Sequence, residues 1–290
     1  MPVINRIAEF HPEITEWRRH IHANPELLFD THKTAAFVAA KLREFGCDEV
    51  VEGIGRTGVV GLIRGRANGS GKVVGLRADM DALPIQERRD LPYKSQNPGV
   101  MHACGHDGHT AMLLGAARYL AETRNFDGAV AVIFQPAEEG GGGGKVMVDE
   151  GMMERFGIQE VYGMHNWPGA PEGMVMMREG PLMAAADTFD ITVTGHGAHA
   201  AKPHDGFDPI LAGSLMVASL QQLSSRNTDP LDSLVVSVTK FHAGTAHNII
   251  PEQAELSGTV RTLKDETRAM AEARIRAVAE GVAAAHGCTV

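Results

Sequence analysis

The sequence predicts an α/β protein with two domains: a larger one with a mostly parallel sheet at residues 1–185, and a ferredoxin-like α+β domain at residues 186–290. Two observations predict this fold class. In the first part, short β-branched runs alternate with helical segments, as in layered α/β domains. In the second part, the order of expected elements is β-α-β-β-α. A chain of 290 residues is long enough for both domains, since domains usually have roughly 100–200 residues.

The first domain is expected to begin with two helices and then to alternate strands with helices. Apolar residues recur at helical spacing over residues 4–22 and 31–45, and Gly46 is a plausible end for the second helix. The runs that read as strands are 57–63, 72–78, 128–135 and 160–165. Further helices are expected at 110–122 and 145–156. Strands joined through helices favour a largely parallel sheet.

The second domain follows a different order. Its expected strands are 188–195, 233–242 and 253–262, and its expected helices are 208–226 and 265–287. A split βαβ, ferredoxin-like unit has a fourth strand after the second helix, and here that strand would begin at the final residues "CTV". We therefore expect that the chain is truncated at its C-terminal side and that this domain is incomplete.

Composition excludes several classes of partner. The formal net charge is -9, and no basic cluster is present, which argues against nucleic acid or an anionic membrane as the main partner. No apolar run approaches the ~18 residues of a membrane span. Cys47, Cys104 and Cys288 are odd in number and far apart, which disfavours a disulfide framework and fits a reducing compartment. A cytoplasmic protein is expected.

Residues of metal-binding type stand at four places where an expected strand ends or a helix begins. These are Asp79 with Asp81, the stretch "MHACGHDGHT" at 101–110, Glu138 with Glu139, and His165. In open α/β sheets, ligands bind beyond the carboxyl ends of the strands. We therefore expect these side chains to converge on one metal site.

Within "MHACGHDGHT", Cys104 and His106 are two residues apart on an extended or looped segment, so both can face one ion. A thiolate and an imidazole suit zinc, manganese, nickel or cobalt. The alternative is a buried cysteine near a hydrogen-bonded histidine. Asp107 and His109 are candidates for partners that orient the ligands, although His109 could equally be a solvated or core histidine.

The stretch "FQPAEEGGGGGKVM" at 134–147 places two acids before five glycines. Neighbouring residues at a strand end face opposite ways, so one of Glu138 and Glu139 can bind a metal while the other reaches the attacking water. Two carboxylates this close need a cation to stay ionised together. A solvated pair of surface acids is the alternative. A phosphate-binding loop is excluded, because Glu139 replaces its first glycine and Val146 its Ser/Thr.

Six stretches together resemble the dinuclear metal amidohydrolases that include hippurate hydrolase, N-acyl-amino-acid aminoacylases and auxin-conjugate hydrolases, relatives of the carboxypeptidase G type. They are "LRADMDALPI", "MHACGHDGHT", "FQPAEEGGGG", "GMHNWP", "GHGAHAAKPHDGFDPI" and "HNIIPEQAELSGTVRT". The resemblance covers residues 4–290. It implies a catalytic domain interrupted by a lid, a homodimer formed through the lid, an N-acyl amino acid substrate, and two divalent metal ions: Mn or Zn, with Ni or Co as further options.

The resemblance also implies roles for individual residues. The implied metal ligands are Cys104, His106, Glu139 and His165, with Glu138 as general base and Asp81 as a supporting carboxylate. On the lid, the implied substrate-binding residues are His199, Asn248 and Arg261. An arginine is a natural partner for the carboxylate of an N-acyl amino acid, while the alternative for Arg261 is a surface charge. The family takes a further histidine ligand from a segment after the lid, and this sequence has no counterpart.

Two other functions stay open at this point. A dipeptidase or exopeptidase of the same broad group is one, and the Cys-x-His pair at Cys104 and His106 disfavours it. A metal-binding homologue that has lost catalysis is the other. The absent histidine supports that interpretation, whereas the pair of Glu138 and Glu139 argues against it.

Overall fold

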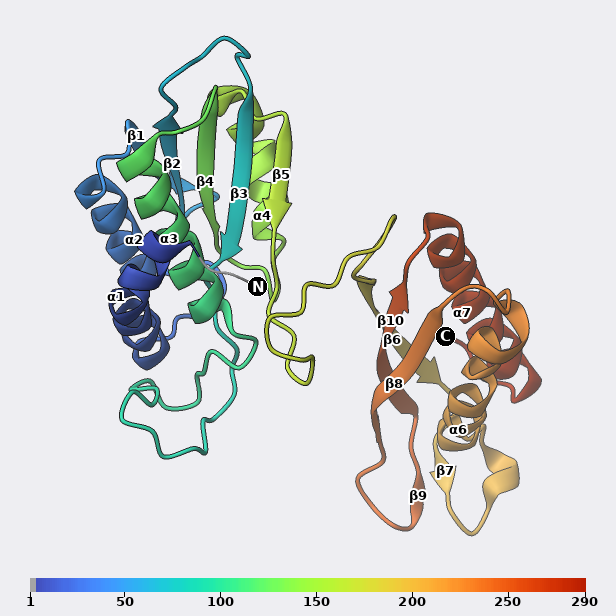
Figure 1. Ribbon diagram of the computed structural model, residues 1–290. Helices are drawn as coiled ribbons and strands as arrows, with labels where there is room; N and C mark the ends of the chain where they lie inside the picture. Colours follow the sequence, from blue (N-terminus) through green and yellow to red (C-terminus); the bar gives the residue numbers. More distant parts are fainter. Residues whose placement is uncertain (1–3) are drawn as a thin grey trace. The chain divides into compact units, whose positions relative to one another are not determined.

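The computed structural model describes residues 4–290, which form two compact units that divide between Met174 and Val175 (Figure 1). Each unit has its own core of buried apolar side chains. Position 185, expected as the domain boundary, is the first residue of strand β6 (Ala185–Thr194). Among the described residues, no helix is both long and apolar enough to cross a membrane.

The first unit is a five-stranded sheet with the strand order β1-β2-β4-β3-β5. Its strands are β1 (Glu49–Ile54), β2 (Gly58–Arg64), β3 (Val73–Asp79), β4 (Ala129–Gln135) and β5 (Glu160–Gly163). Its helices are α1 (Asn5–Ala23), α2 (His32–Glu44), α3 (His106–Thr123), α4 (Gly143–Asp149) and α5 (Met152–Phe156). The single helix expected at 145–156 is interrupted at Gly151, whose φ of 82° lies in the left-handed region.

The prediction of a mostly parallel sheet is wrong, because the sheet is mixed. β3 runs parallel to β4 and to β5, but β2 runs antiparallel to both β1 and β4. The reason lies in two short connections without a helix. β1, which the sequence did not predict, joins β2 through a tight turn with positive φ at Gly55 and Arg56, and β2 joins β3 through residues 65–72 alone. Connections this short return the chain antiparallel, because a parallel crossover needs a dozen or more residues.

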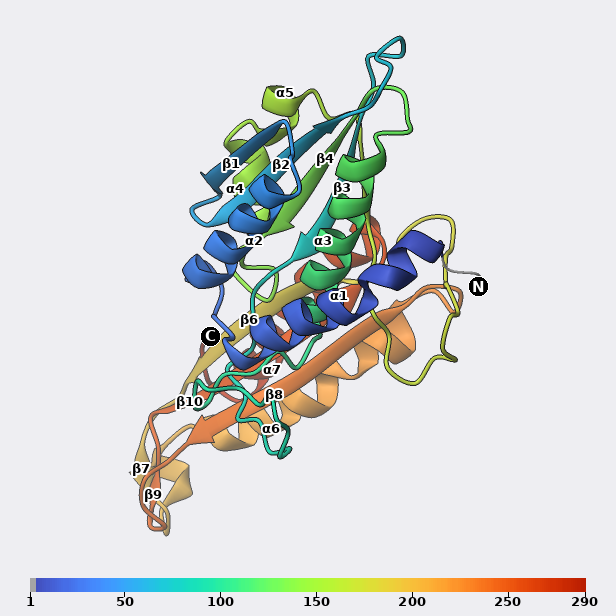
Figure 2. The same ribbon diagram turned by 60° about the vertical axis from the view of Figure 1, so that its left-hand side comes forward.

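Both faces of this sheet are buried, which follows from the alternation of side chains along its strands. Val59 and Ile63 of β2 pack into the core that includes residues of α1, α2 and α3. Val60 and Leu62 pack into the core formed with α4 and α5. Figure 2 shows the first three helices on one side of the sheet and the last two on the other. The polar ends of the central strands are therefore the part of the sheet left for chemistry.

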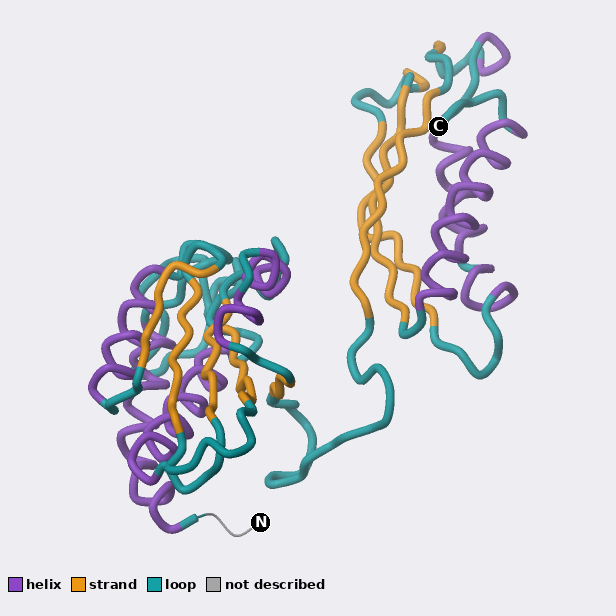
Figure 3. The backbone as a smooth tube through the Cα atoms, turned by 90° about the horizontal axis from the view of Figure 1, so that it is seen from above, coloured by secondary structure: helices purple, strands orange, loops and turns teal. Residues whose placement is uncertain are grey.

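The second unit follows the expected β-α-β-β-α order. An antiparallel sheet has the order β6-β10-β8, with β8 (Leu234–Ala243) and β10 (Gln253–Thr262). Helices α6 (Pro209–Leu220) and α7 (Asp265–Ala285) lie on one face of it (Figure 3). A small ribbon pairs β7 (Ala198–His199) with β9 (Ile249–Ile250). The expected helix at 208–226 ends earlier, in a π-helical turn at Leu223–Asn227.

Gly258 in β10 allows close packing that no side chain would permit. A Cβ atom there would lie 2.3 Å from Phe189 Cζ and 2.4 Å from the Ser237 carbonyl oxygen. We expect Gly258→Ala to lower the free energy of unfolding by ~1–3 kcal/mol through overpacking, measured by chemical denaturation. The control is Gly281→Ala in α7, where an added Cβ atom would meet no other atom within 4 Å. This change should raise the free energy of unfolding by ~0.5–1 kcal/mol. Equal values for the two variants would contradict the packing argument.

Candidate metal centre

The candidate site assembles where β3, β4 and β5 end. β3 lies between β4 and β5 and runs parallel to both, so the carboxyl ends of the three strands share one edge of the sheet. Asp79 ends β3 and Asp81 follows it, Glu138 and Glu139 follow β4, and His165 follows β5. The first turn of α3 adds its own side chains, because Gly105, with a φ of 94°, starts this helix at residue 106 rather than at the expected residue 110.

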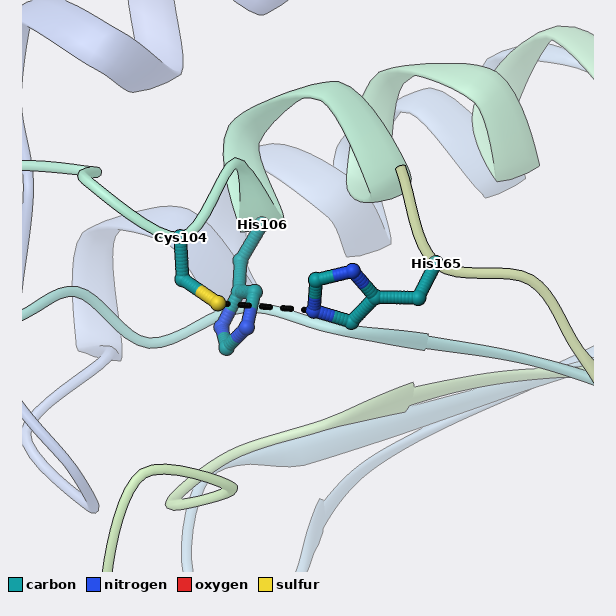
Figure 4. Close-up of side chains that lie close together, drawn as sticks. All are labelled: Cys104, His106 and His165. Carbon is teal, nitrogen blue, oxygen red and sulfur yellow. Dashed lines mark hydrogen bonds between the residues drawn. The ribbon is translucent and has the colours of Figure 1, made fainter. Parts of the chain in front are cut away.

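The structure brings three of the predicted ligands together. Cys104, His106 and His165 each offer one ligand atom, and these atoms lie within 4.8 Å of one another. Cys104 Sγ is 3.4 Å from His165 Nε2. Figure 4 shows the three side chains converging from the loop before α3, from the start of α3 and from the segment after β5. The fourth predicted ligand, Glu139, has Oε1 3.8 Å from His106 Nε2.

Four carboxylates surround the fully buried His106 ring. Its nitrogens lie 3.4 Å from Asp81, 3.6 Å from Asp79, 3.8 Å from Glu138 and 3.8 Å from Glu139. Neither nitrogen makes a hydrogen bond, and Glu139 Oε1 is also buried without a partner. Buried polar atoms left unpaired, among acids this close, favour a bound cation. The sulfur, nitrogen and oxygen donors therefore fit a divalent metal.

The ionisation of these groups follows from their surroundings. Burial and the neighbouring Glu139 raise the pKa of the Cys104 thiol to about 12, so a cation has to displace its proton before the sulfur can bind as thiolate. Burial also raises the pKa of Glu138, with His106 opposing the shift. That direction suits a carboxylate that takes up and returns a proton near neutral pH.

Asp81 holds the backbone that carries the paired acids. Its Oδ1 accepts the Glu138 N–H at 3.0 Å, and its Oδ2 accepts the Glu139 N–H at 3.1 Å. The turn just before them has a positive φ of 51° at Ala137. Asp81 is 1% exposed, so water cannot easily substitute for it. The predicted supporting carboxylate therefore lies beside the acids and orients both of their peptide groups.

Replacing Asp81 tests this arrangement. Asparagine has one acceptor oxygen, so in Asp81→Asn one of the two N–H groups would face an NH₂ donor. We expect the metal affinity to fall by ~10–100-fold, as for other groups that orient ligands, measured by titration with Zn²⁺ or Mn²⁺. The control is Asp127→Asn, since Asp127 also accepts a backbone N–H, from Ser70 at 3.1 Å, in an exposed loop. An unchanged affinity in Asp81→Asn would contradict the orienting role.

Asp107, expected as a partner that orients the ligands, pairs instead with Arg18 and His22 in a buried network whose other members sequence reasoning missed. His22 of α1 is 3% exposed, and its ring nitrogens lie 2.8 Å from Asp107 and 3.2 Å from Glu87. Arg18, one helical turn earlier, lies 2.7 Å from Asp107. The hydrogen bond to Asp107 raises the pKa of His22 despite burial. The helical spacing of Arg18 and His22 was the available signal, and the network fixes the long connection between β3 and α3.

The three predicted substrate-binding residues lie in the second unit. His199 ends β7 and Asn248 directly precedes β9, and the Asn248 carbonyl accepts the N–H of Ala200 at 3.0 Å. Arg261 lies near the other end of β10, and its guanidinium contacts Thr259 Oγ1 and, at 3.0 Å, the Val260 carbonyl oxygen. Within this unit, therefore, the structure brings two of the three together.

Known proteins are similar to this chain over most of its length. The profile of Peptidase family M20/M25/M40 matches residues 75–286. A hippurate hydrolase from Campylobacter jejuni is 49% identical over 99% of this chain and 74% of its own length. An N-acyl-L-amino acid amidohydrolase from Geobacillus stearothermophilus is 44% identical over 98% of this chain and 76% of its own length.

A solved structure extends the comparison to three dimensions. The YXEP protein of Bacillus subtilis, described as a dinuclear metal binding peptidase from the M20 family, superposes with a TM-score of 0.80. It is 40% identical, and the match covers 97% of this chain and 72% of that one. On the profile, the relatives and the shared fold, this chain belongs to peptidase family M20/M25/M40.

Proposed function

We propose that this chain hydrolyses the amide bond of N-acyl amino acids with two divalent metal ions. The family match and the amidohydrolase relatives make it a metal-dependent amidohydrolase. The observation that carries the proposal is the convergence of Cys104, His106 and His165 within 4.8 Å, with Glu138 and Glu139 next to them. A thiolate, two imidazoles and two acids serve metal-assisted hydrolysis, in which one acid binds and the other moves a proton.

In this proposal Cys104, His106, Glu139 and His165 hold the metal ions. When bound, such an ion lowers the pKa of water from ~15.7 towards ~7 and polarises a carbonyl group. Glu138 accepts a proton from the attacking water on its carboxylate and later delivers it to the nitrogen of the leaving amine. Its side chain is 41% exposed, so water can reach it, while Asp81 keeps its backbone in place.

We further propose which metal binds, what the second unit does and how two chains assemble. The mixed donor set favours zinc or manganese, with nickel and cobalt as further options. The second unit would act as a lid, with His199, Asn248 and Arg261 facing the substrate. It would also join two copies of the chain, which is supported by the two edge strands, β6 and β8, of its sheet. A cytoplasmic location agrees with the three unpaired cysteines.

A substrate panel tests the proposal. Hippurate, N-acetyl amino acids and unblocked dipeptides would be assayed with and without added Mn²⁺ or Zn²⁺. We expect metal-dependent release of the amino acid from the acylated substrates and little from the dipeptides. A preference for dipeptides would instead identify a peptidase, and metal binding without hydrolysis of any substrate would identify a protein that has lost catalysis. Light scattering would test the proposed homodimer.

A further inference from the structure

A second group of buried side chains could be mistaken for part of the metal centre. Asp79, His106 and His109 also place ligand atoms within 4.8 Å of one another, and all three are buried. We propose that His109 binds no metal and is a positioning residue, which links Asp79 to Asn166 and so fixes the imidazole ligand His165. This inference rests on the proposed function; it decides between the roles that the sequence left open for His109 and adds roles for Asp79 and Asn166.

Both nitrogens of His109 already have partners. Nδ1 lies 2.6 Å from Asp79 Oδ1, and Nε2 accepts the backbone N–H of Asn166 at 3.1 Å. Since the Asp79 carboxylate can only accept, Nδ1 carries the proton, and Nε2 uses its lone pair for the Asn166 N–H. Asn166 Oδ1 also contacts this nitrogen, and because rotation of the amide exchanges its O and N ends, the Asn166 NH₂ group can face the same lone pair. His109 therefore has no lone pair free for a metal ion.

Asp79 is fixed from several sides, as an orienting carboxylate should be. Its Oδ2 accepts from Arg77 Nη1 at 2.7 Å and lies 3.6 Å from His106 Nε2. Its backbone oxygen accepts the Thr110 hydroxyl at 2.8 Å. The positive charge of Arg77 beside Oδ2 opposes binding of a cation to the same oxygen. Asp79 is therefore better placed to orient the His109 ring than to bind a metal.

Asn166 connects this arrangement to the second imidazole ligand. His165 Nδ1 lies 2.6 Å from the carbonyl oxygen of Asn166. That bond places the proton on Nδ1 and leaves Nε2 free to face Cys104. Asn166 also packs against the turn before α3, because a Cβ atom on Gly105 would lie 2.5 Å from Asn166 Oδ1. Displacing Asn166 would therefore move His165 relative to Cys104.

Two substitutions of His109 each remove one of its two hydrogen bonds, either the one to Asp79 or the one to Asn166. Asparagine places an NH₂ group close to the position of Nδ1 and keeps the bond to Asp79, but it is too short to replace Nε2. Glutamine places a carbonyl oxygen close to the position of Nε2 and keeps an acceptor for the Asn166 N–H, but it loses the donor to Asp79. Matched controls are His32→Asn and His32→Gln, at an exposed position at the start of α2.

The first measurement uses the metal-free protein and follows exchange of the Asn166 amide hydrogen by NMR. We expect its protection to be lost in His109→Asn, retained in His109→Gln and unchanged in both controls. Protection equal to that of the parent protein in His109→Asn would overturn the inference. This measurement does not depend on hydrolysis, so failure of the substrate panel would leave its result intact.

The second measurement is titration with Co²⁺, followed by its visible absorption. A positioning role predicts that both His109 variants bind the same number of ions as the parent at saturation, with an affinity ~10–100-fold lower. The controls should match the parent. If either variant loses a whole equivalent of Co²⁺ at saturation, His109 is a ligand and the inference is wrong. It is also wrong if both variants bind Co²⁺ as tightly as the parent.

Discussion

Replacing Glu138 with glutamine is expected to reduce kcat by at least ~10²–10⁴-fold, the usual contribution of a general base, while the metal content stays nearly unchanged. The carboxamide has almost the same shape but cannot accept the proton of the attacking water. Because Asp81 holds residue 138 through its backbone N–H, the loop should keep its conformation. Steady-state kinetics on hippurate and elemental analysis of the purified protein measure the two quantities.

The neighbouring acid supplies the matched control. Glu139→Gln is expected to lower the metal content, since Glu139 Oε1 is buried without a hydrogen-bond partner beside His106. The two variants differ by one position and have the same change in charge, so they separate the chemical role from the metal-binding role. Full activity in Glu138→Gln, or the opposite assignment of the two effects, would show that the roles given to these acids are wrong.

Replacing Cys104 with alanine is expected to remove at least one metal equivalent and, with it, hydrolysis. Its sulfur lies 3.4 Å from His165 Nε2, and both atoms belong to the cluster that includes His106. Thiolate is the softest donor of the set, so its loss should weaken zinc binding more than manganese binding. Metal analysis after dialysis and titration with each ion would measure the change.

Cys47 provides the control for this substitution. It is a half-buried thiol in the same unit that packs beside the core of α1, α2 and α3. Cys47→Ala should keep the full metal content and cost only some stability through lost packing. If Cys104→Ala bound both ions as the parent does, the sulfur would not be a ligand, and the proposed centre would have to be rebuilt without it.

Much of the fold could be predicted because its signals are local. The β-branched runs that became β2, β3 and β4 and the apolar spacing of α1, α2 and α3 are visible in single stretches of sequence. β1 was missed because "EVVEGI" is short and contains Gly53, where the pairing with β2 shifts register. The mixed character of the sheet was missed for two reasons: with β1 unseen, its tight turn to β2 could not be read, and the connection at residues 65–72 between β2 and β3 was not recognised as too short for a parallel crossover.

The site shows the same division between local and long-range information. Cys104, His106, Glu138 and Glu139 stand out because each lies in a short stretch dense in metal-binding residue types. His22 and Glu87 do not, because they are 65 residues apart in sequence and gain meaning only when α1 packs beside α3. The same holds for Asn166, whose contact with His109 depends on the parallel placement of β3 and β5.

The two hydrogen bonds that Asp81 accepts from backbone N–H groups have a practical consequence for redesign. Asp81 recognises two main-chain amide groups, which every amino acid except proline possesses, and ignores the side chains attached to them. Histidine, cysteine or asparagine at positions 138 and 139 would therefore keep both hydrogen bonds to Asp81. Side chains at these two positions can therefore be varied while the backbone beside the metal centre stays fixed, which is a starting point for catalysts that use other ions or other reactions.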